Sequence, residues 1–288
     1  MTRSRATAIG FVAVLLWALL ATLTVGSAPV PPLLLNTICF AIGGVLGLIW
    51  TMATGGLAQL RAVPLPVYAF GTLGLFGYHA LYFSALRLAP AAEAGLIAYL
   101  WPLLIVLLSG LLPGERLRAA HLLGAALGFA GAALIISGGS TGFQTQYAAG
   151  YGLAFACALT WSTYSVVSRR FGTTPTASVA VFCIATAILS APLHLAFEQT
   201  VWPVGPAGWA ATIALGLGPV GLAFYVWDVG VKRGDIQLLG TSSYAAPLLS
   251  TVLLVVSGLA APSWSLAIAA VLITGGALIA ARASFRRA

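Results

Sequence analysis

Long apolar blocks separated by short polar turns make up most of the 288-residue sequence. A helix crosses the bilayer core, about 30 Å thick, with about 20 apolar residues. The stretches of that length cover residues 6–25, 32–53, 65–87, 91–112, 119–137, 148–168, 176–197, 206–230, 236–258 and 264–283. A transmembrane barrel would instead show alternating segments of about ten residues. The pattern therefore predicts an all-α membrane protein with ten transmembrane helices.

The composition agrees with this prediction, since 60% of the residues are hydrophobic, 6% are charged and the mean hydropathy is +1.03. Such values lie outside the range of soluble domains. The longest connection, residues 138–147, reads as a polar turn, so no soluble domain is expected. Residues 1–28 have the basic start of a signal peptide. We interpret them as the first span, because the apolar stretch is long and has a counterpart later in the chain.

The net charge of +8 is explained by the placement of the basic residues. If the N-terminus is cytoplasmic, only Arg87 falls on the outer side. The cytoplasmic side then receives Arg3, Arg5, Arg61, Arg116, Arg118, Arg169, Arg170, Lys232, Arg233, Arg282, Arg286 and Arg287. This bias follows the positive-inside rule. We expect both termini in the cytoplasm. We also expect the basic residues to face the lipid bilayer surface, with no nucleic-acid partner.

The two halves of the chain match each other at an offset of 144–145 residues. The matched pairs include Trp17 with Trp161, Gly71 with Gly216, Arg87 with Lys232, Gly95 with Gly240, Tyr99 with Tyr244 and Pro102 with Pro247. Each half holds five predicted spans, and an odd number makes the second half enter the membrane from the opposite side. Inverted repeats of this kind are typical of transporters that bind a solute between the repeats. We expect repeats over residues 1–140 and 148–288 around a central cavity.

Pro102 and Pro247 lie inside predicted spans, where a proline removes a backbone hydrogen bond and crowds the carbonyl four residues earlier. The freed carbonyls would be those of Ala98 and Ser243. Such groups are tolerated in a membrane only inside protein or beside a wet cavity. We therefore expect kinks that take part in gating. A simple packing kink remains the alternative.

Aromatic side chains with a polar tip recur in several predicted spans and suggest an amphipathic cavity with flat walls. The candidate cavity residues are Trp17, Tyr78, His79, Tyr82, Tyr99, Trp101, Trp161, Tyr164, Tyr225, Ser243 and Tyr244. Many tyrosines and tryptophans in membrane proteins instead form belts at the lipid interface. That alternative applies most to Trp161 and Tyr164.

Ionisable residues are rare in the spans, as their cost in a bilayer requires. His79 is the deepest, and Asp228 lies near the cytoplasmic edge, four residues before Lys232. Both are candidates for energy coupling, against the alternatives of a packing histidine and a local ion pair. No predicted span has a basic residue in its middle third, which argues against phosphorylated solutes. A solute that neutralises its own charges fits better, and amino acids have this property.

Three cysteines, Cys39, Cys157 and Cys183, are scattered in predicted spans without the spacing of a metal site, so we expect no metal and no cofactor. A membrane-embedded enzyme would need a catalytic constellation, and the chain has no GxSxG, no HExxH and no paired acids. A passive channel is a further alternative. The sequence is compatible with a monomer.

The ten spans, the five-helix inverted repeats, the Trp17 and Trp161 pair and the YLWP and YAAP runs resemble the drug/metabolite transporter superfamily. The repeat is similar to the EamA-type unit of that superfamily. The resemblance implies a secondary transporter in a bacterial inner membrane that exports aromatic and other neutral amino acids by alternating access. Export of other small drugs or metabolites is the alternative within the same fold.

Overall fold

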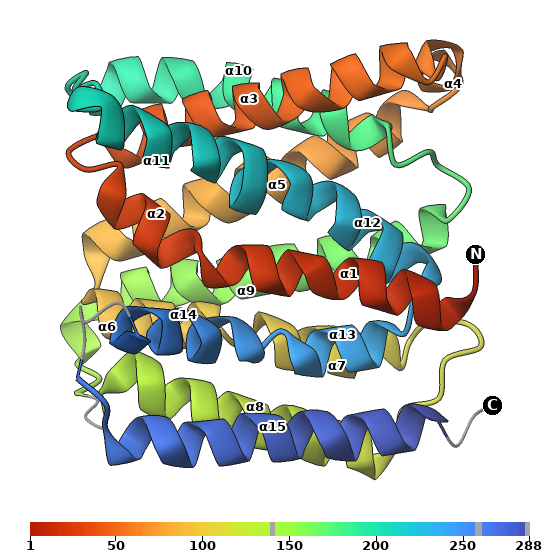
Figure 1. Ribbon diagram of the computed structural model, residues 1–288, viewed down its shortest axis with the longest axis vertical. Helices are drawn as coiled ribbons and strands as arrows, with labels where there is room; N and C mark the ends of the chain where they lie inside the picture. Colours follow the sequence, from red (N-terminus) through yellow and green to blue (C-terminus); the bar gives the residue numbers. More distant parts are fainter. Residues whose placement is uncertain (139–141, 257–260, 286–288) are drawn as a thin grey trace.

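The chain folds into a bundle of helices that lie side by side (Figure 1). The computed structural model describes residues 1–138, 142–256 and 261–285. Every regular element within these ranges is helical and none is a strand, which confirms the predicted all-α class. The end of the predicted span 236–258, part of the polar connection 138–147 and the two arginines at 286 and 287 lie outside the described residues.

The first half of the chain forms eight helices. They are α1 (Arg3–Ala18), α2 (Leu20–Gly26), α3 (Pro32–Ala53), α4 (Leu57–Arg61), α5 (Leu65–Leu88), α6 (Ala91–Ala98), α7 (Trp101–Ser109) and α8 (Ala119–Ser137). The second half forms α9 (Ala148–Ser168), α10 (Ser178–Phe197), α11 (Gly205–Leu217), α12 (Ala223–Arg233), α13 (Ile236–Ser242), α14 (Ala245–Val256) and α15 (Trp264–Phe285). Three short segments join them, η1 (Thr145–Tyr147), η2 (Arg169–Phe171) and the π-helical η3 (Gly218–Leu222).

Eight helical stretches of the described chain are long and apolar enough to cross a membrane. They correspond to eight of the predicted spans. The predicted spans at 65–87 and 148–168 form α5 and α9, which have 24 and 21 residues but are not among the eight. Polar side chains such as His79 and Ser165 make these two helices less apolar, and the two pack against each other in the bundle.

Two of the long stretches are interrupted just before a proline. The helix stops between α6 and α7 at Tyr99 and Leu100, and it stops between α13 and α14 at Ser243 and Tyr244. In each case a backbone N–H then bonds three residues back, as Leu100 does to Ile97 and Tyr244 does to Thr241. A proline in the first turn of the following segment is compatible with these breaks, because the N–H it lacks would have no partner there.

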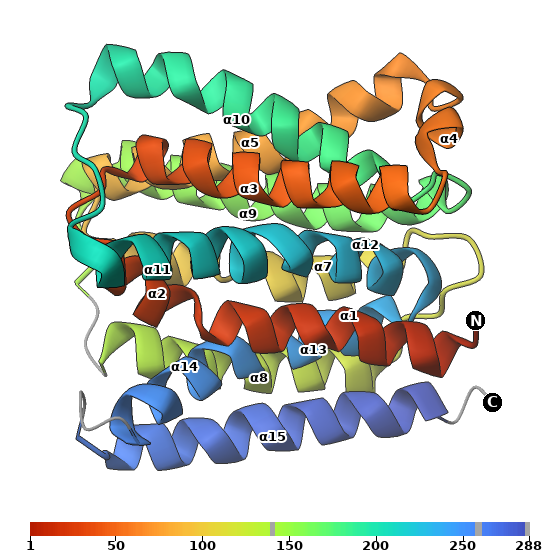
Figure 2. The same cartoon turned by 45° about the horizontal axis from the view of Figure 1, so that its top comes forward.

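The two halves pack closely where a glycine of one helix lies against a glycine of another. Gly124 of α8 and Gly276 of α15 approach so closely that a Cβ on Gly276 would lie 2.4 Å from the Gly124 carbonyl oxygen. A Cβ on Gly10 of α1 would lie 2.8 Å from the Cα of Gly230 in α12. Small residues allow such backbone contact between membrane helices. Helix α3 also packs on α10 across the halves, where Gly44 of α3 lies against the Ile184 side chain. Figure 2 shows the bundle from a second direction.

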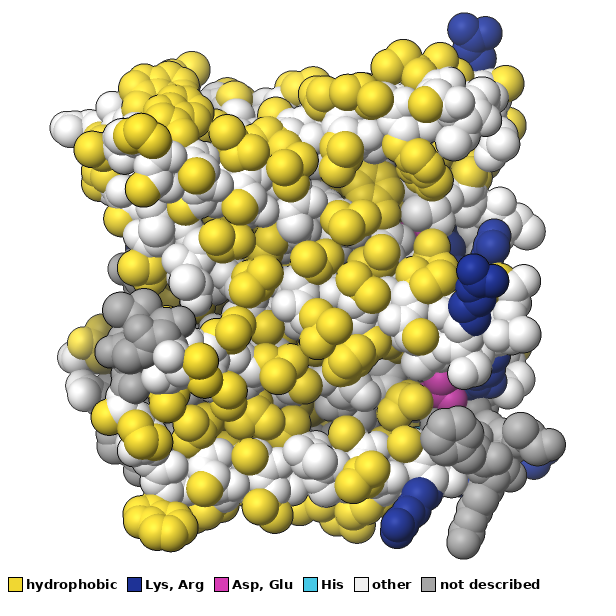
Figure 3. Space-filling model, in the orientation of Figure 1, with side chains coloured by type: hydrophobic (Ala, Val, Ile, Leu, Met, Phe, Trp, Pro, Cys, Tyr) yellow, Lys and Arg dark blue, Asp and Glu magenta, His cyan; other side chains and the backbone are white. Residues whose placement is uncertain are grey.

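On the face shown in Figure 3, apolar side chains cover the middle and the visible Lys and Arg side chains gather at one end. This basic end is where α1 begins and α15 ends (Figure 1). Arg87 lies at the opposite end and pairs with Glu198 at 3.1 Å. The Glu198 carboxylate also accepts hydrogen bonds from the N–H groups of Leu33 and Leu34 at the start of α3. A carboxylate is stabilised at a helix N-terminus by these free donors.

Candidate functional site

Four tryptophans from four different helices meet in the centre of the bundle. Trp17 of α1 lies 5.9 Å from both Trp101 of α7 and Trp161 of α9, measured between ring centroids. Trp227 of α12 lies 5.1 Å from Trp17 and 5.8 Å from Trp101. Two of the four come from each half of the chain, so this tryptophan cluster forms where the halves join. Most of the contacts are edge-to-face or tilted, the arrangements that aromatic rings prefer.

Hydrogen bonds hold two of these rings in place. The indole N–H of Trp17 donates to the Pro219 carbonyl in η3 at 3.1 Å, and that of Trp227 donates to the Ser165 hydroxyl at 3.1 Å. The sequence reasoning missed Trp227, which is only 1% exposed. The repeat could have indicated Trp227, because the 145-residue offset matches it with Tyr82, one of the predicted cavity residues.

Tyr78, His79 and Tyr82 form an aromatic stripe along α5, beside the tryptophan cluster. Tyr78 stacks on Tyr82 at 6.2 Å with an angle of 5° between the rings, and it contacts Trp161 at 5.5 Å. Tyr78, His79 and Tyr82 are only partly buried. Since spacings of three and four place side chains on one face of a helix, the stripe extends the aromatic surface along α5.

His79 is surrounded by aromatic rings. Its ring centroid lies 4.9 Å from that of Phe40 and 6.3 Å from that of Phe224. Its Nδ1 lies 2.7 Å from the Leu75 carbonyl oxygen one turn earlier. That geometry assigns a proton to Nδ1, because a carbonyl oxygen can only accept.

The predicted residues at the two helix breaks have different environments. Tyr99 lies 6.4 Å from Trp101 and is partly exposed. Tyr244, its counterpart, is fully buried, and its hydroxyl accepts a hydrogen bond from the Leu103 N–H at 3.1 Å. The Ser243 hydroxyl donates to the Leu239 carbonyl of its own helix at 2.8 Å. Only Tyr99 of these three therefore borders the tryptophan cluster directly.

Tyr164 and Tyr225 point in different directions. Tyr164 is buried against Trp161 at 5.3 Å and joins the cluster. Tyr225 donates its hydroxyl to the Gly43 carbonyl on α3 at 2.9 Å and contacts Trp50 at 6.4 Å. The structure thus places Tyr225 between α12 and α3 and does not bring it to the other candidates.

Asp228 is buried in a local network near the basic end. Its carboxylate lies 2.8 Å from Lys232 Nζ and accepts a hydrogen bond from the Thr176 hydroxyl at 2.8 Å. Lys232 also donates to the Thr174 carbonyl at 3.1 Å. The pairing four residues apart that the sequence suggested is present. No group of three or more His, Cys, Asp or Glu residues in the described part of the chain could hold a metal ion.

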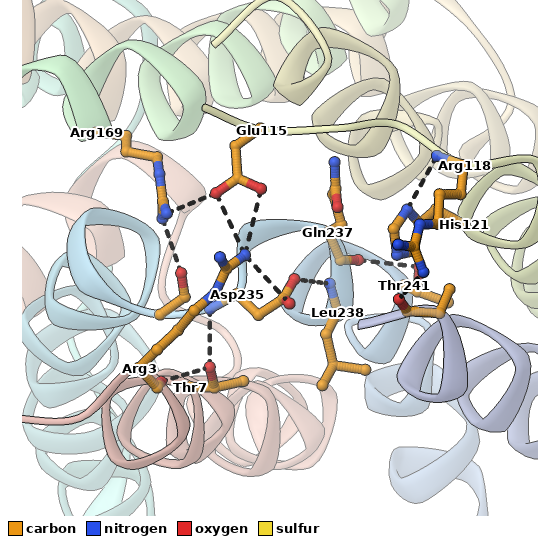
Figure 4. A network of polar contacts seen from close by, with 12 residues as sticks. Arg3, Thr7, Glu115, Arg118, His121, Arg169, Asp235, Gln237, Leu238 and Thr241 are labelled. Carbon is orange, nitrogen blue, oxygen red and sulfur yellow. Dashed lines mark hydrogen bonds and ion pairs between the residues drawn. The ribbon is translucent and has the colours of Figure 1, made fainter. Parts of the chain in front are cut away.

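Four charged residues close the basic end between the halves (Figure 4). Arg3 Nη2 lies 3.2 Å from a carboxylate oxygen of Glu115 and 3.2 Å from one of Asp235. Arg169 Nη2 lies 2.7 Å from the other Glu115 oxygen. We call Arg3, Glu115, Arg169 and Asp235 the charged cluster. It links the first half of the chain, which supplies Arg3 and Glu115, to the second.

Backbone carbonyls complete the partners of Arg169. Its Nη1 donates to the carbonyls of Val231 at 2.9 Å and Gly234 at 2.8 Å. Burial lowers the pKa of the Arg169 guanidinium below its ordinary value, and the Glu115 carboxylate opposes that change. A guanidinium stays charged in proteins even so, and the charged cluster therefore retains its ion pairs at neutral pH.

Known proteins match the whole chain. A family model described as the EamA-like transporter family matches residues 5–137 and 148–282. The chain is 59% identical to a protein of Ancylobacter novellus named aromatic amino acid exporter YddG, over 97% of this chain and 98% of that protein. It is 28% identical to the Escherichia coli protein of the same name, over 97% of each. A crystal structure of a protein with 59% identity aligns with a TM-score of 0.92 over 97% of this chain and 98% of that one.

Proposed function

Because the chain belongs to the EamA-like transporter family, whose members are transporters and not enzymes, we propose that it exports aromatic and other neutral amino acids by alternating access. The observation that carries the proposal is the tryptophan cluster between the halves, in a chain 59% identical to a protein named an aromatic amino acid exporter. Flat aromatic walls fit a neutral, partly apolar solute.

The proposed solute site consists of the tryptophan cluster and the aromatic residues that border it. Trp227 joins the sequence-predicted members because it contacts three of them. The proposed lining is Trp17, Tyr78, His79, Tyr82, Tyr99, Trp101, Trp161, Tyr164 and Trp227. Tyr244 and Ser243 act at the helix break, and Tyr225 holds α12 to α3.

The proposed architecture is ten transmembrane helices in two inverted repeats, residues 1–140 and 148–288. Helices α1 and α9, which begin the two halves, run in opposite directions across the bundle (Figure 1), which supports the inversion. The contacts between helices support the repeat too. At the offset of 144–145 residues, α9 corresponds to α1 and α12 corresponds to part of α5, and the structure contains both the α5–α9 and the α1–α12 contact. Helices α5 and α9 complete the ten, since protein neighbours satisfy their polar side chains.

We place the protein in a bacterial inner membrane with the basic end and both termini in the cytoplasm. The gathering of Lys and Arg at that end supports this orientation (Figure 3). The charged cluster then holds the two halves together at the cytoplasmic side. The breaks before Pro102 and Pro247 supply flexible points at which α6 and α7, and α13 and α14, can move relative to each other.

Export follows the solute's own gradient in this proposal. His79 contacts aromatic rings, which would not stabilise an imidazolium as a carboxylate does. Asp228 is held by Lys232 and Thr176. Among the described residues His79 therefore lies beside no carboxylate that would favour its protonated form, and Asp228 is already held in an ion pair, so a proton plays no obligatory part.

Efflux from proteoliposomes tests the proposal. Vesicles preloaded with radiolabelled L-phenylalanine should lose label faster with the protein than without it, and a Trp161→Ala variant should lower the rate without loss of folded protein. The matched control is Trp202→Ala, an exposed tryptophan at the opposite end from the charged cluster. Efflux no faster than from protein-free vesicles for every neutral amino acid tried would refute the proposal.

A further inference from the structure

Helices α8 and α15 leave a pocket between them at the basic end of the bundle. Its volume is about 310 Å³, and it is lined by Arg118, Ala120, Ile279, Arg282 and Ala283. Arg118 and Ala120 lie where α8 begins, and the other three residues lie in the last two turns of α15. The pocket therefore combines two guanidinium groups with a short apolar wall.

The Arg118 side chain bridges α8 and α15. Its Nη1 donates to the Ala283 carbonyl at 2.9 Å, and its backbone N–H donates to His121 Nδ1 at 3.2 Å. Figure 4 shows Arg118 beside His121 at the start of α8. A guanidinium has five N–H donors in a fixed planar fork. The bond to Ala283 thus holds Arg118 in place and leaves donors free for a further acceptor.

The pocket has a positive charge that favours an anionic ligand. The acidic residues at this end are paired elsewhere, Glu115 with Arg3 and Arg169, Asp235 with Arg3, and Asp228 with Lys232. Among the described residues, no ion pair reaches Arg118 or Arg282. The planar fork of an arginine matches the oxygens of a phosphate better than those of most other anions. Two arginines in one pocket therefore indicate a phosphate group as the ligand.

The depth of the pocket in the membrane suits the phosphate of a phospholipid. Helix α8 has 19 residues, which gives a length of about 28 Å at about 1.5 Å per residue. The hydrocarbon core of a bilayer is about 30 Å thick. The first turn of α8, which holds Ala120, therefore lies where the hydrocarbon core meets the lipid headgroups.

A lipid can reach the pocket from the side, because α15 lies at the edge of the bundle in both Figure 1 and Figure 2. One turn further into the membrane, Leu123 on α8 is 53% exposed and Leu278 on α15 is 57% exposed. Leu123 follows Ala120 by three residues and Leu278 precedes Arg282 by four, so each leucine shares a helix face with a residue of the pocket. A phospholipid with its phosphate in the pocket would place its acyl chains against these leucines.

We propose that the pocket between α8 and α15 binds the headgroup of an anionic phospholipid such as phosphatidylglycerol, with its phosphate between Arg118 and Arg282. Basic pockets between transmembrane helices bind acidic headgroups in this way. A zwitterionic lipid carries an ammonium group, which the two arginines repel. The pocket and the tryptophan cluster share no helix, so lipid binding is independent of which solute the protein transports.

Arg282→Gln tests the lipid site. Native mass spectrometry of the detergent-purified protein gives the dissociation constant of the first bound lipid, for phosphatidylglycerol and for phosphatidylcholine with the same acyl chains. We expect the wild type to bind phosphatidylglycerol more tightly than phosphatidylcholine. Arg282→Gln should weaken phosphatidylglycerol binding about fivefold, the contribution of one arginine near an anionic headgroup, and leave phosphatidylcholine binding unchanged. Arg282 is exposed, so this variant should fold normally.

Three controls separate this site from general attraction between arginines and lipids. Arg61→Gln removes an exposed arginine on α4, at the same end of the bundle but outside the pocket, and should leave the ratio of the two dissociation constants unchanged. Arg118→Gln should weaken phosphatidylglycerol binding at least as much as Arg282→Gln does, and should also lower the melting temperature because the bond to Ala283 is lost. Inorganic phosphate should not displace the lipid, because it has no acyl chains to contact the leucines.

Equal affinities of the wild type for the two lipids would overturn the inference. So would an Arg282→Gln variant that binds phosphatidylglycerol as tightly as Arg61→Gln does. Displacement of phosphatidylglycerol by inorganic phosphate at the same concentration would also overturn it, and would identify a site for free phosphate instead.

Discussion

Replacing Tyr244 by phenylalanine removes one hydrogen bond that crosses between the two broken helices. The Tyr244 hydroxyl accepts from the Leu103 N–H at 3.1 Å, and Leu103 lies in the first turn of α7. Backbone N–H groups in a first turn have no acceptor within their own helix. The tyrosine therefore satisfies a donor that the break at Tyr99 and Leu100 leaves free. The ring itself packs against Gly128 and Phe129 and is retained in the variant.

The expected cost is that of leaving a buried backbone N–H unpaired, about 1–3 kcal/mol. Little cavity forms, because only one oxygen is lost. On the scale of about 2–4 °C per kcal/mol for soluble proteins of comparable size, the melting temperature of the detergent-purified protein should fall by several degrees. Tryptophan fluorescence during heating gives this temperature.

Tyr99→Phe is the matched control, since the repeat places Tyr99 opposite Tyr244. Within the described residues the Tyr99 hydroxyl has no hydrogen bond. Its loss should change stability by no more than about 0.5 kcal/mol, as for side chains without specific partners. Equal melting temperatures for the two variants, or no decrease for Tyr244→Phe, would refute the hydrogen-bond assignment.

Three other variants test the packing, the ion pair and the energy source. Gly10→Ala should destabilise the protein by about 1–3 kcal/mol, because its Cβ would lie 2.8 Å from Gly230 Cα; an unchanged melting temperature would argue against the close crossing of α1 and α12. Asp228→Asn should destabilise by about 3–5 kcal/mol by leaving Lys232 buried without its carboxylate, and adding Lys232→Met should recover part of this. Failure of the second change to restore stability would show that the pair is not coupled. Efflux from wild type and from His79→Ala should be equally independent of an imposed pH gradient; a gradient requirement that the variant loses would make His79 the proton site.

The sequence predicted the helices well because the spans are long and apolar. The helix breaks lie beside Pro102 and Pro247. They could be predicted because a proline disrupts the helix at its own position, whatever the rest of the fold. Helices α5 and α9 are less apolar than the other spans. They were still predicted as spans, because each apolar stretch is long enough to cross the bilayer despite its polar side chains.

The candidate site was harder to predict, because facing directions depend on how helices pack. Tyr225 and Trp227 are two residues apart, so they point to nearly opposite sides of α12. Trp227 faces the tryptophan cluster and Tyr225 faces α3. The charged cluster could not be predicted, because Arg3 reaches Asp235 only when the two halves pack together.

Counterflow of L-phenylalanine in proteoliposomes tests the central claim most directly. Vesicles that contain the wild-type protein are loaded with unlabelled L-phenylalanine and diluted into a trace of labelled solute. A carrier that alternates access at the tryptophan cluster exchanges one for the other, so label should accumulate transiently above its external concentration. The same vesicles with Trp161→Ala should accumulate much less. Entry of label that is unaffected by unlabelled solute inside would contradict the account and identify a channel.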